Sequence, residues 1–345
     1  MRIGVAFSGG LTPSDVVECV KLAEALGYES AWVAEGHGGD QFAILGACAV
    51  ATRRIRLGTS ISSVFVRSAT TIGMAAATVD QLANGRFILG LGGSHRVQVE
   101  PEHGIPFVQP TARLRDTIAI VRALVQDGLV SHRGEVITIE RFDLWFRPLR
   151  PQIPIYVAAL FPRMLEIAGQ LADGVLLTWP TTGTIARAVE HVAIGARQAG
   201  RDATAVDVAS LIPCAVAKTA ADARDALRPA VGLYAGFFPR YNRLLAEAGF
   251  SDAVRETKEA FDRGGRDAGA AEGPGWLNGH TRHVSRADRR LPARGACPSH
   301  REPARIRRRR ARDGDGSDPR MRALTNPGGR SRGKIPRRRP VIFTA

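Results

Sequence analysis

An acid, an imidazole and a second acid lie within one glycine-rich segment near the N-terminus, at Glu35, His37 and Asp40. Imidazole titrates near neutral pH and a carboxylate can accept or relay a proton, so these residue types suit protonation steps in catalysis. A single histidine in a surface loop is more often inert, so the pattern depends on what the fold places beside it. Glu35 and His37 are our candidates for catalytic residues.

A second glycine-rich segment, Gly92-Gly93-Ser94-His95, follows an apolar run. That run, residues 87–91, has no polar alternation, which is typical of a strand buried on both faces in a parallel sheet flanked by helices. Ligands bind at the carboxyl ends of such strands, because loops there can vary without disturbing the core. Glycines at a strand end often only turn the chain, but they also let the backbone approach a flat ring.

Short apolar runs alternate with amphipathic stretches along the chain, as in a parallel sheet built from β/α units. Seven strands are predicted, at residues 3–7, 30–33, 55–58, 87–91, 155–158, 174–177 and 206–212. Six helices are predicted, at 14–26, 41–51, 69–82, 112–126, 162–172 and 185–199, and a helical stretch at 221–261 is expected to break near Gly236 and Pro239. The pattern predicts an α/β fold, a (β/α)₈ TIM barrel that lacks a proper eighth strand. The two sheet edges exposed by that loss would favour association. Residues 127–150 interrupt the repeat and are predicted to pack beside the active face.

The positive charge of the chain is concentrated at its C-terminal end. Residues 263–345 contain 22 basic and 7 acidic residues, whereas residues 1–262 contain 26 of each. We therefore predict one folded domain over 1–262. Residues 263–345, rich in Arg, Gly and Pro, are interpreted either as a disordered basic tail or as the product of a reading-frame shift. Read one nucleotide later, the codons for residues 286–292 could encode an amphipathic helix suited to precede the missing strand.

Several classes of partner are disfavoured. The neutral domain gives no electrostatic argument for nucleic acid, and the arginine clusters at 307–310 and 337–339 have no interleaved aromatic residues, so no specific nucleic-acid partner is expected. No apolar run approaches the roughly 20 residues needed to span a bilayer and no leader is visible, so we expect a cytoplasmic protein with no membrane partner. Cys19, Cys48, Cys214 and Cys297 lack metal-ligand spacing, so no metal site is expected and the thiols are interpreted as reduced.

Four ordered motifs resemble the luciferase-like monooxygenase family of flavin and deazaflavin oxidoreductases. They are Arg54 to Arg67 (RIRLGTSISSVFVR), Ala75 to Ser94 (AAATVDQLANGRFILGLGGS), Pro154 to Glu166 (PIYVAALFPRMLE) and Ala172 to Val175 (ADGV). The resemblance covers about residues 1–260 and is strongest to the coenzyme F420-dependent branch, which includes methylenetetrahydromethanopterin reductase.

The resemblance implies a barrel that binds F420, or alternatively FMN, at the carboxyl ends of its strands. It also implies hydride transfer at the ring. F420 does not readily activate oxygen, so that cofactor indicates a dehydrogenase or reductase, whereas FMN indicates a monooxygenase. By position, a family cis peptide would join Ser60 and Ile61, with an ordinary trans strand end as the alternative. Relatives commonly have an acid directly before the histidine, but Gly36 separates Glu35 from His37 here.

The same resemblance implies the cofactor-binding residues. The backbone turn before the helix at 162–172 would bind the cofactor phosphate, because free N–H groups and the positive dipole end of a helix attract anions. Arg163 and Arg67 are candidates for the phosphate and the acidic tail, and Trp179 either lines the pocket or caps the barrel. The full predicted set is Phe7, Ser60, Ile61, Ser62, Arg67, Gly92, Gly93, Ser94, His95, Ala158, Ala159, Leu160, Arg163 and Thr178.

Three functions therefore remain open. The first is an F420-dependent oxidoreductase that transfers a hydride to or from an unidentified small organic substrate. The second is an FMN-dependent monooxygenase. The third is a non-catalytic or defective flavin-binding relative. Many relatives are dimers, and the sequence leaves a homodimer open.

Overall fold

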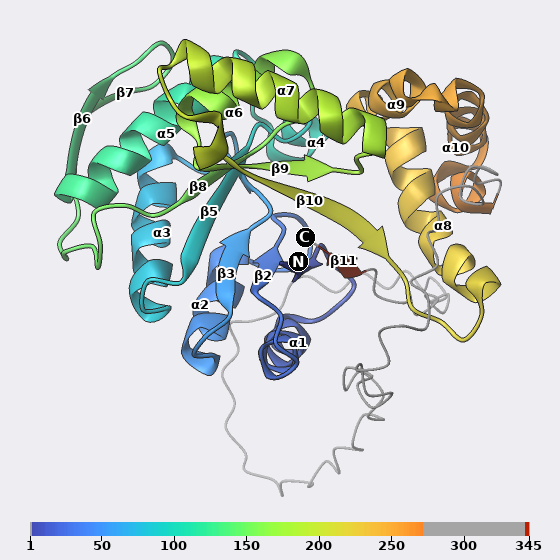
Figure 1. Ribbon diagram of the computed structural model, residues 1–345, viewed down its shortest axis with the longest axis horizontal. Coiled ribbons are helices and arrows are strands. Elements are labelled where there is room, and N and C mark those ends of the chain that lie inside the picture. The colour runs from blue at the N-terminus through green and yellow to red at the C-terminus, as the bar shows by residue number, and fades with distance from the viewer. Residues whose placement is uncertain (1, 272–341, 345) are drawn as a thin grey trace, which may run out of the picture.

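The computed structural model describes residues 2–271 and 342–344, which form a closed ring of strands surrounded by helices (Figure 1). The seven predicted parallel strands are all present. They are β1 (Gly4–Phe7), β2 (Ser30–Val33), β3 (Arg56–Thr59), β5 (Phe87–Gly92), β8 (Ile155–Ala158), β9 (Gly174–Thr178) and β10 (Asp207–Cys214). Their pairing follows this chain order from β1 to β10, as in a TIM barrel. The predicted fold class is therefore confirmed.

The eighth place in the ring is taken by a strand of a different kind. β11 (Ile342–Thr344) lies between β1 and β10 and pairs with both in the antiparallel sense. Within residues 2–271 and 342–344 no parallel eighth strand is found, as predicted, but the expected exposure of two sheet edges is wrong, because β11 pairs with both edges. The remaining expectations for the C-terminal segment concern residues 272–341, which lie outside the described part of the chain.

Six helices cover the outside of the ring at the predicted places. Most of them begin at a residue whose side chain accepts a backbone N–H of the first turn, namely Thr12, Asp40, Ser68 and Thr181. Such caps satisfy N–H groups that have no partner inside the helix. The helices are α1 (Pro13–Ala25), α2 (Gln41–Ala51), α3 (Ala69–Leu82), α5 (Pro110–Asp127), α6 (Pro162–Leu171) and α7 (Thr182–Gln198).

Residues 127–150, which were predicted to pack beside the active face, pack against helix α5 instead. They form a hairpin of β6 (Leu129–Arg133) and β7 (Thr138–Asp143). The N–H groups of residues 135–137 donate to the carboxylate of Asp116 in the middle of α5, and the apolar side of the hairpin packs in a small cluster with Ile120 and Leu124 of the same helix. The prediction was wrong, because alternation shows that a strand has one buried face without showing which element covers it.

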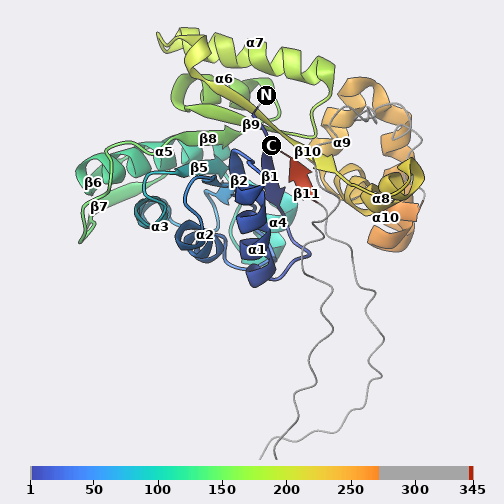
Figure 2. The same cartoon turned by 60° about the horizontal axis from the view of Figure 1, so that its bottom comes forward.

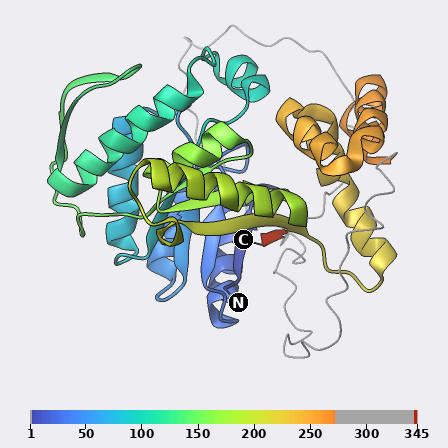
Figure 3. The same cartoon turned by 45° about the horizontal axis from the view of Figure 1, so that its top comes forward.

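The helical stretch predicted at residues 221–261 forms three helices. They are α8 (Ala220–Phe237), α9 (Pro239–Leu245) and α10 (Ser251–Ala271), with a short helical turn at Ala246–Phe250. The break falls at Pro239, as predicted, and α10 continues beyond the expected domain end at residue 262. A Cβ on Gly236 would lie 2.8 Å from Phe261 Cβ, so glycine allows α8 and α10 to approach closely. In all three views these helices stand opposite the β6–β7 hairpin (Figure 1, Figure 2 and Figure 3).

The buried side chains form two main layers. The larger lies between the strands and the surrounding helices, and the smaller fills the ring and continues into α8 and α9. None of the helices in the described part of the chain is long and apolar enough to cross a lipid bilayer. Cys48 and Cys214 are free thiols, whereas Cys19 is disulfide-bonded, so the expectation of reduced thiols is wrong for Cys19.

Candidate active site

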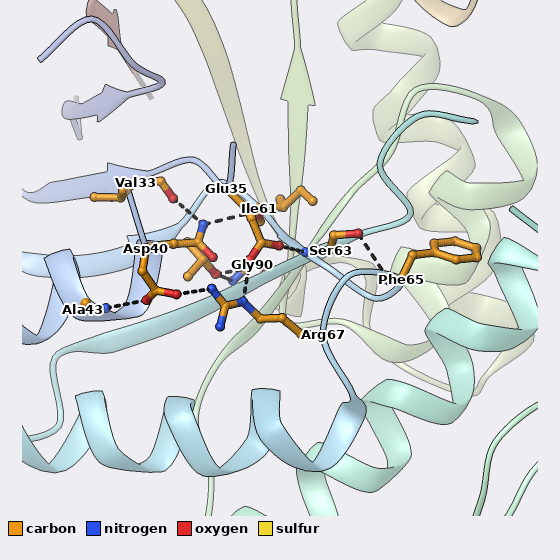
Figure 4. Close-up of polar contacts among 11 residues, drawn as sticks. Val33, Glu35, Asp40, Ala43, Ile61, Ser63, Phe65, Arg67 and Gly90 are labelled. Atoms are coloured by element: carbon orange, nitrogen blue, oxygen red, sulfur yellow. Dashed lines mark hydrogen bonds and ion pairs between the residues drawn. The ribbon is translucent and has the colours of Figure 1, made fainter. Parts of the chain in front are cut away.

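The third strand ends in a cis peptide bond between Ser60 and Ile61, at the place the family resemblance implied. The fully buried Gln41, the first residue of α2, donates from Nε2 to the carbonyl oxygens of Val33 at 2.6 Å and Ile61 at 3.3 Å (Figure 4). The chain then continues as β4 (Ser62–Ser63), which pairs with the end of β5. The cis peptide is therefore held at the carboxyl edge of the ring between two strand ends.

A network of two acids and one arginine holds this strand end in place. Arg67 donates from Nε to Glu35 at 2.5 Å and from a terminal nitrogen to Asp40 at 2.6 Å, and Glu35 accepts the Ser63 N–H at 2.6 Å (Figure 4). Partial burial lowers the pKa of Arg67, but its hydrogen bonds to the two carboxylates outweigh this effect and raise it. Both predicted residues, Glu35 and Arg67, are thus engaged with each other, and this arrangement suits a positioning role.

His37 lies on the rim of the ring beside a helix that the sequence did not predict. That helix is α4 (Arg96–His103), and its Glu102 carboxylate lies 3.2 Å from His37 Nε2. The His37 side chain is 76% exposed and that of Glu102 is 31% exposed, so solvent and a bound molecule can both reach the pair. His37 therefore lies beside Glu102, whereas Glu35, the other predicted catalytic residue, is engaged with Arg67.

Glycine at position 92, at the end of β5, leaves room for the side chain of Ile61. A Cβ at this position would lie 2.8 Å from both Cδ1 and Cγ1 of Ile61 and 3.3 Å from the Cβ of Ala158. Gly93 has more room, since its nearest contact would be Pro110 Cβ at 3.5 Å. Ser94 has a φ of 51° and turns the chain away from the strand. The glycines thus bring the end of β5 against the predicted ring-binding residues.

His95 is buried against aromatic side chains. Its ring centroid lies 4.6 Å from that of Phe238 and 5.4 Å from that of Tyr241. Burial, together with a smaller effect of the nearby charge of Arg240, lowers the pKa of His95 to about 4. His95 is therefore neutral at pH 7 and does not supply a positive charge for an anionic ligand.

The turn from β8 into α6 also reaches the mouth of the ring. Ala158 and Leu160 are partly buried and pack against the inner cluster that includes Phe238 and Tyr241, and Ala159 is buried. Helix α6 begins at Pro162 without a side-chain cap, and the N–H of Met164 donates to the Phe161 carbonyl, so in the first turn the N–H of Arg163 remains available to a ligand. Arg163 is exposed in its first turn. The geometry thus keeps this turn a candidate anion site.

The predicted residues at the ends of β9 and β1 differ in their placement. Thr178 is partly buried, and the following Trp179 packs with its ring centroid 4.9 Å from that of Tyr234, inside the ring layer. Phe7 is buried in the other layer, between the strands and the helices. Phe7 therefore faces away from the interior, because side chains alternate along a strand and its neighbour Ala6 points inward.

Tyr234, Phe238 and Tyr241, which we call the aromatic cover, lie over the mouth of the ring. Their ring centroids lie 4.7 to 6.1 Å from one another, and Ile61, Ala158 and Leu160 pack against the cluster that contains them. Burial raises the pKa of Tyr234 to about 12, so its hydroxyl is neutral at pH 7.

Two buried polar atoms beside the cis peptide have no hydrogen-bond partner among the described residues. They are Gln41 Oε1 and Ser62 Oγ. Leaving a buried polar atom unpaired is costly, so such atoms call for an explanation such as a polar ligand. Apolar and aromatic side chains with a few polar atoms among them are the kinds of group that line the binding sites of flat heteroaromatic rings.

The protein matches one family model over most of its length. The model of the luciferase-like monooxygenases matches residues 1–277. The chain belongs to the luciferase-like monooxygenase family. Members of this family are oxidoreductases, and the cis peptide and the glycine-rich end of β5 stand where the resemblance implied them.

Two curated relatives carry the same name and similar identity. The 5,10-methylenetetrahydromethanopterin reductase of Archaeoglobus fulgidus is 30% identical over 265 residues, covering 76% of this chain and 78% of the relative. The corresponding reductase of Methanolobus tindarius is 30% identical over 260 residues, covering 74% of this chain and 77% of the relative.

A solved structure supports the fold. The coenzyme F420-dependent tetrahydromethanopterin reductase of Methanopyrus kandleri superposes with a TM-score of 0.73 at 24% identity, over 80% of this chain and 84% of that one. At this identity the likeness establishes the barrel fold, and the chemistry must be argued from the residues of the site.

Proposed function

We propose that this protein is an F420-dependent oxidoreductase that transfers a hydride between the deazaflavin ring and a small organic substrate. The observation that carries the proposal is the pair of unpaired buried polar atoms, Gln41 Oε1 and Ser62 Oγ, at the carboxyl ends of the strands beside the aromatic cover. The F420-dependent relatives support the choice of cofactor. When bound, F420 supplies a two-electron carrier that accepts or releases a hydride.

The side chains around the mouth would orient this ring and exclude water. Ile61 and the backbone at Gly92 form one apolar wall, and Trp179 and the aromatic cover form the other. The turn at Ala158 to Leu160, with the uncapped start of α6, would take the phosphate, and Arg163 stands beside it. A dry mouth strengthens each electrostatic contact within it.

Proton handling is assigned to His37 and Glu102. Their side chains lie 3.2 Å apart on the rim, and an imidazole beside a carboxylate is a pair of groups suited to passing a proton to or from a reacting atom. Glu35 would act through position, because it holds Arg67 and the Ser63 N–H under the cis peptide. The substrate class would be set by the loops at the rim, which vary most in such barrels.

The cofactor assignment is tested by titrating the purified full chain separately with F420 and with FMN and following fluorescence quenching. Saturable binding of F420 with much weaker binding of FMN is expected. Preference for FMN would instead support the monooxygenase function. Binding of neither would overturn the proposal and favour a defective relative.

Two substitutions test the assignment of proton transfer to His37 and Glu102. With a substrate found by screening, His37→Gln and Glu102→Gln should each lower turnover about 100-fold, the lower end of the usual contribution of general acid–base catalysis. F420 binding should stay within about twofold, because neither side chain lies in the predicted ring-binding set. Glu259→Gln, an exposed change on α10, is the matched control. Unchanged turnover in His37→Gln would contradict the assignment.

A further inference from the structure

A pocket of about 580 Å³ opens at the edge of the mouth, outside the predicted ring-binding set except for His95. Three segments form it: the start of α4, the nearby stretch that leads into α5, and the start of α9, which is distant in the sequence. Its lining residues are His95, Arg96, Val97, Phe107, Val108, Gln109, Pro110, Pro239 and Arg240. None of these residues is acidic.

Two arginines approach one aromatic ring in this pocket. The guanidinium carbons of Arg96 and Arg240 lie 5.3 Å and 5.6 Å from the centroid of Phe107, within the range of cation–π contacts. Arg96 is also paired with Glu100 and donates to the Phe107 carbonyl at 2.7 Å. Glu100 in turn accepts the Phe107 N–H at 3.0 Å. The charge of Arg96 is therefore largely compensated within the chain.

Arg240 has no such compensation. Among the described residues no hydrogen bond or ion pair engages its guanidinium, and its neighbour across Phe107 is a second cation. Desolvation lowers the pKa of Arg240, and the charge of Arg96 lowers it further. An arginine held in a pocket beside another arginine is stabilised when an anion binds between or beside them.

The helix ends beside the pocket also favour a negatively charged ligand. Helix α5, of 18 residues, begins at Pro110 after Gln109, and helix α4 begins after His95, and neither start has a side-chain cap. Their positive ends and free N–H groups therefore both lie at the pocket wall, where an anion would be favoured. The arginines and the helix ends are independent features that favour the same kind of ligand.

We infer that this pocket is a binding site for a phosphate or carboxylate group carried by a ligand whose uncharged part enters the ring. Arg240 is its principal charged residue, and Arg96 and the starts of α4 and α5 complete it. His95 connects the pocket to the mouth, since its ring also contacts Phe238 and Tyr241. The anion belongs either to the acidic arm of F420 or to an acidic substrate, and only the first source rests on the proposed function.

The site is tested first without any cofactor. Inorganic pyrophosphate is titrated into the full chain by calorimetry at low and at moderate salt. Arg240→Gln should raise the dissociation constant at least tenfold, while Arg255→Gln, which removes the same charge from α10, should leave it within twofold. Binding that is absent, or equal in the wild type and Arg240→Gln, would overturn the inference. Thermal melts of both variants check that each remains folded.

A second titration identifies the source of the anion. F420 and the deazaflavin chromophore lacking the acidic arm are compared on the wild type and Arg240→Gln. Weakened binding of F420 alone assigns the pocket to the cofactor arm. Unchanged binding of both, with weakened binding of pyrophosphate, assigns it to the substrate. If pyrophosphate binds the pocket but neither deazaflavin binds the protein, the pocket stands and the proposed function fails.

Discussion

The network of Glu35 under the cis peptide gives a sharp test of whether this acid positions the strand or moves a proton. Glu35→Gln preserves the size of the side chain but removes its charge. In the folded protein it weakens two charge-assisted hydrogen bonds, to the Ser63 N–H and to Arg67 Nε. The Glu35 side chain is only 16% exposed and that of Arg67 22%, so solvent replaces these contacts poorly.

The expected cost follows from these contacts. Each hydrogen bond to a charged group contributes about 1.5–3 kcal/mol, and the amide of glutamine retains part of both, so we expect a loss of about 2 kcal/mol in the free energy of unfolding. For a domain of this size, that corresponds to a fall in Tm of about 4–8 °C. Arg67 keeps its second carboxylate, Asp40, which limits the loss.

The assay is urea unfolding of the full chain without cofactor, followed by far-UV circular dichroism, with a thermal melt as a second measure. Glu259→Gln on the exposed side of α10 is the matched control and should change the free energy by less than about 0.5 kcal/mol. If Glu35→Gln left the stability unchanged yet abolished turnover, the positioning role would be refuted and Glu35 would be a proton donor or acceptor.

Three further predictions concern the same edge and the base of the barrel. Gly92→Ala should cost about 1–3 kcal/mol and weaken F420 binding, because the new Cβ would lie 2.8 Å from two carbons of Ile61, which would have to move; melts and fluorescence titration measure both effects. Asp80→Asn should cost about 3–5 kcal/mol in urea unfolding, because Asp80 is 1% exposed and accepts two bonds, at 2.9 and 2.7 Å, from Arg150. Desolvation raises the pKa of Asp40, but the hydrogen bonds and charge of Arg67 outweigh this effect, so the pKa of Asp40 is lowered in the folded protein. The ionised Asp40 carboxylate therefore stabilises the fold above its unfolded pKa of about 4, and this stabilisation is lost as the pH falls. Asp40→Asn should flatten the decline in Tm measured between about pH 5 and 3.

Each of these predictions has a control and a contrary outcome. Gly46→Ala, inside α2 and with the nearest contact of its Cβ at 3.8 Å, should stabilise by up to about 1 kcal/mol, and a Gly92→Ala that costs nothing would show that Ile61 is not held against β5. Asp262→Asn on the surface of α10 controls for the loss of one carboxylate, and a loss in Asp80→Asn no larger than this control would contradict the buried pair. A steeper acid decline in Asp40→Asn than in the wild type would reverse the sign assigned to Asp40.

The sequence alone determined the ring of strands and much of its edge. Apolar runs without alternation predict strands buried on both faces, and this depends only on neighbouring residues, so all seven parallel strands and the break at Pro239 were found. The glycines after Leu91 also follow from neighbouring residues, whereas the place of the cis peptide was implied by the family resemblance.

Only the tertiary structure decided which side chains meet. The partner of His37 is Glu102 on α4, a helix whose polar sequence and internal Pro101 gave no apolar period to predict it. The hairpin within residues 127–150 packs against α5, and the sequence could not show this, because an alternating strand does not reveal which element packs on its apolar face. Arg96, Phe107 and Arg240 form one pocket although the two arginines are far apart in the chain, and no local pattern encodes such a contact. Local chemistry sets the elements, but the closing of the ring brings distant charges together and so defines the site.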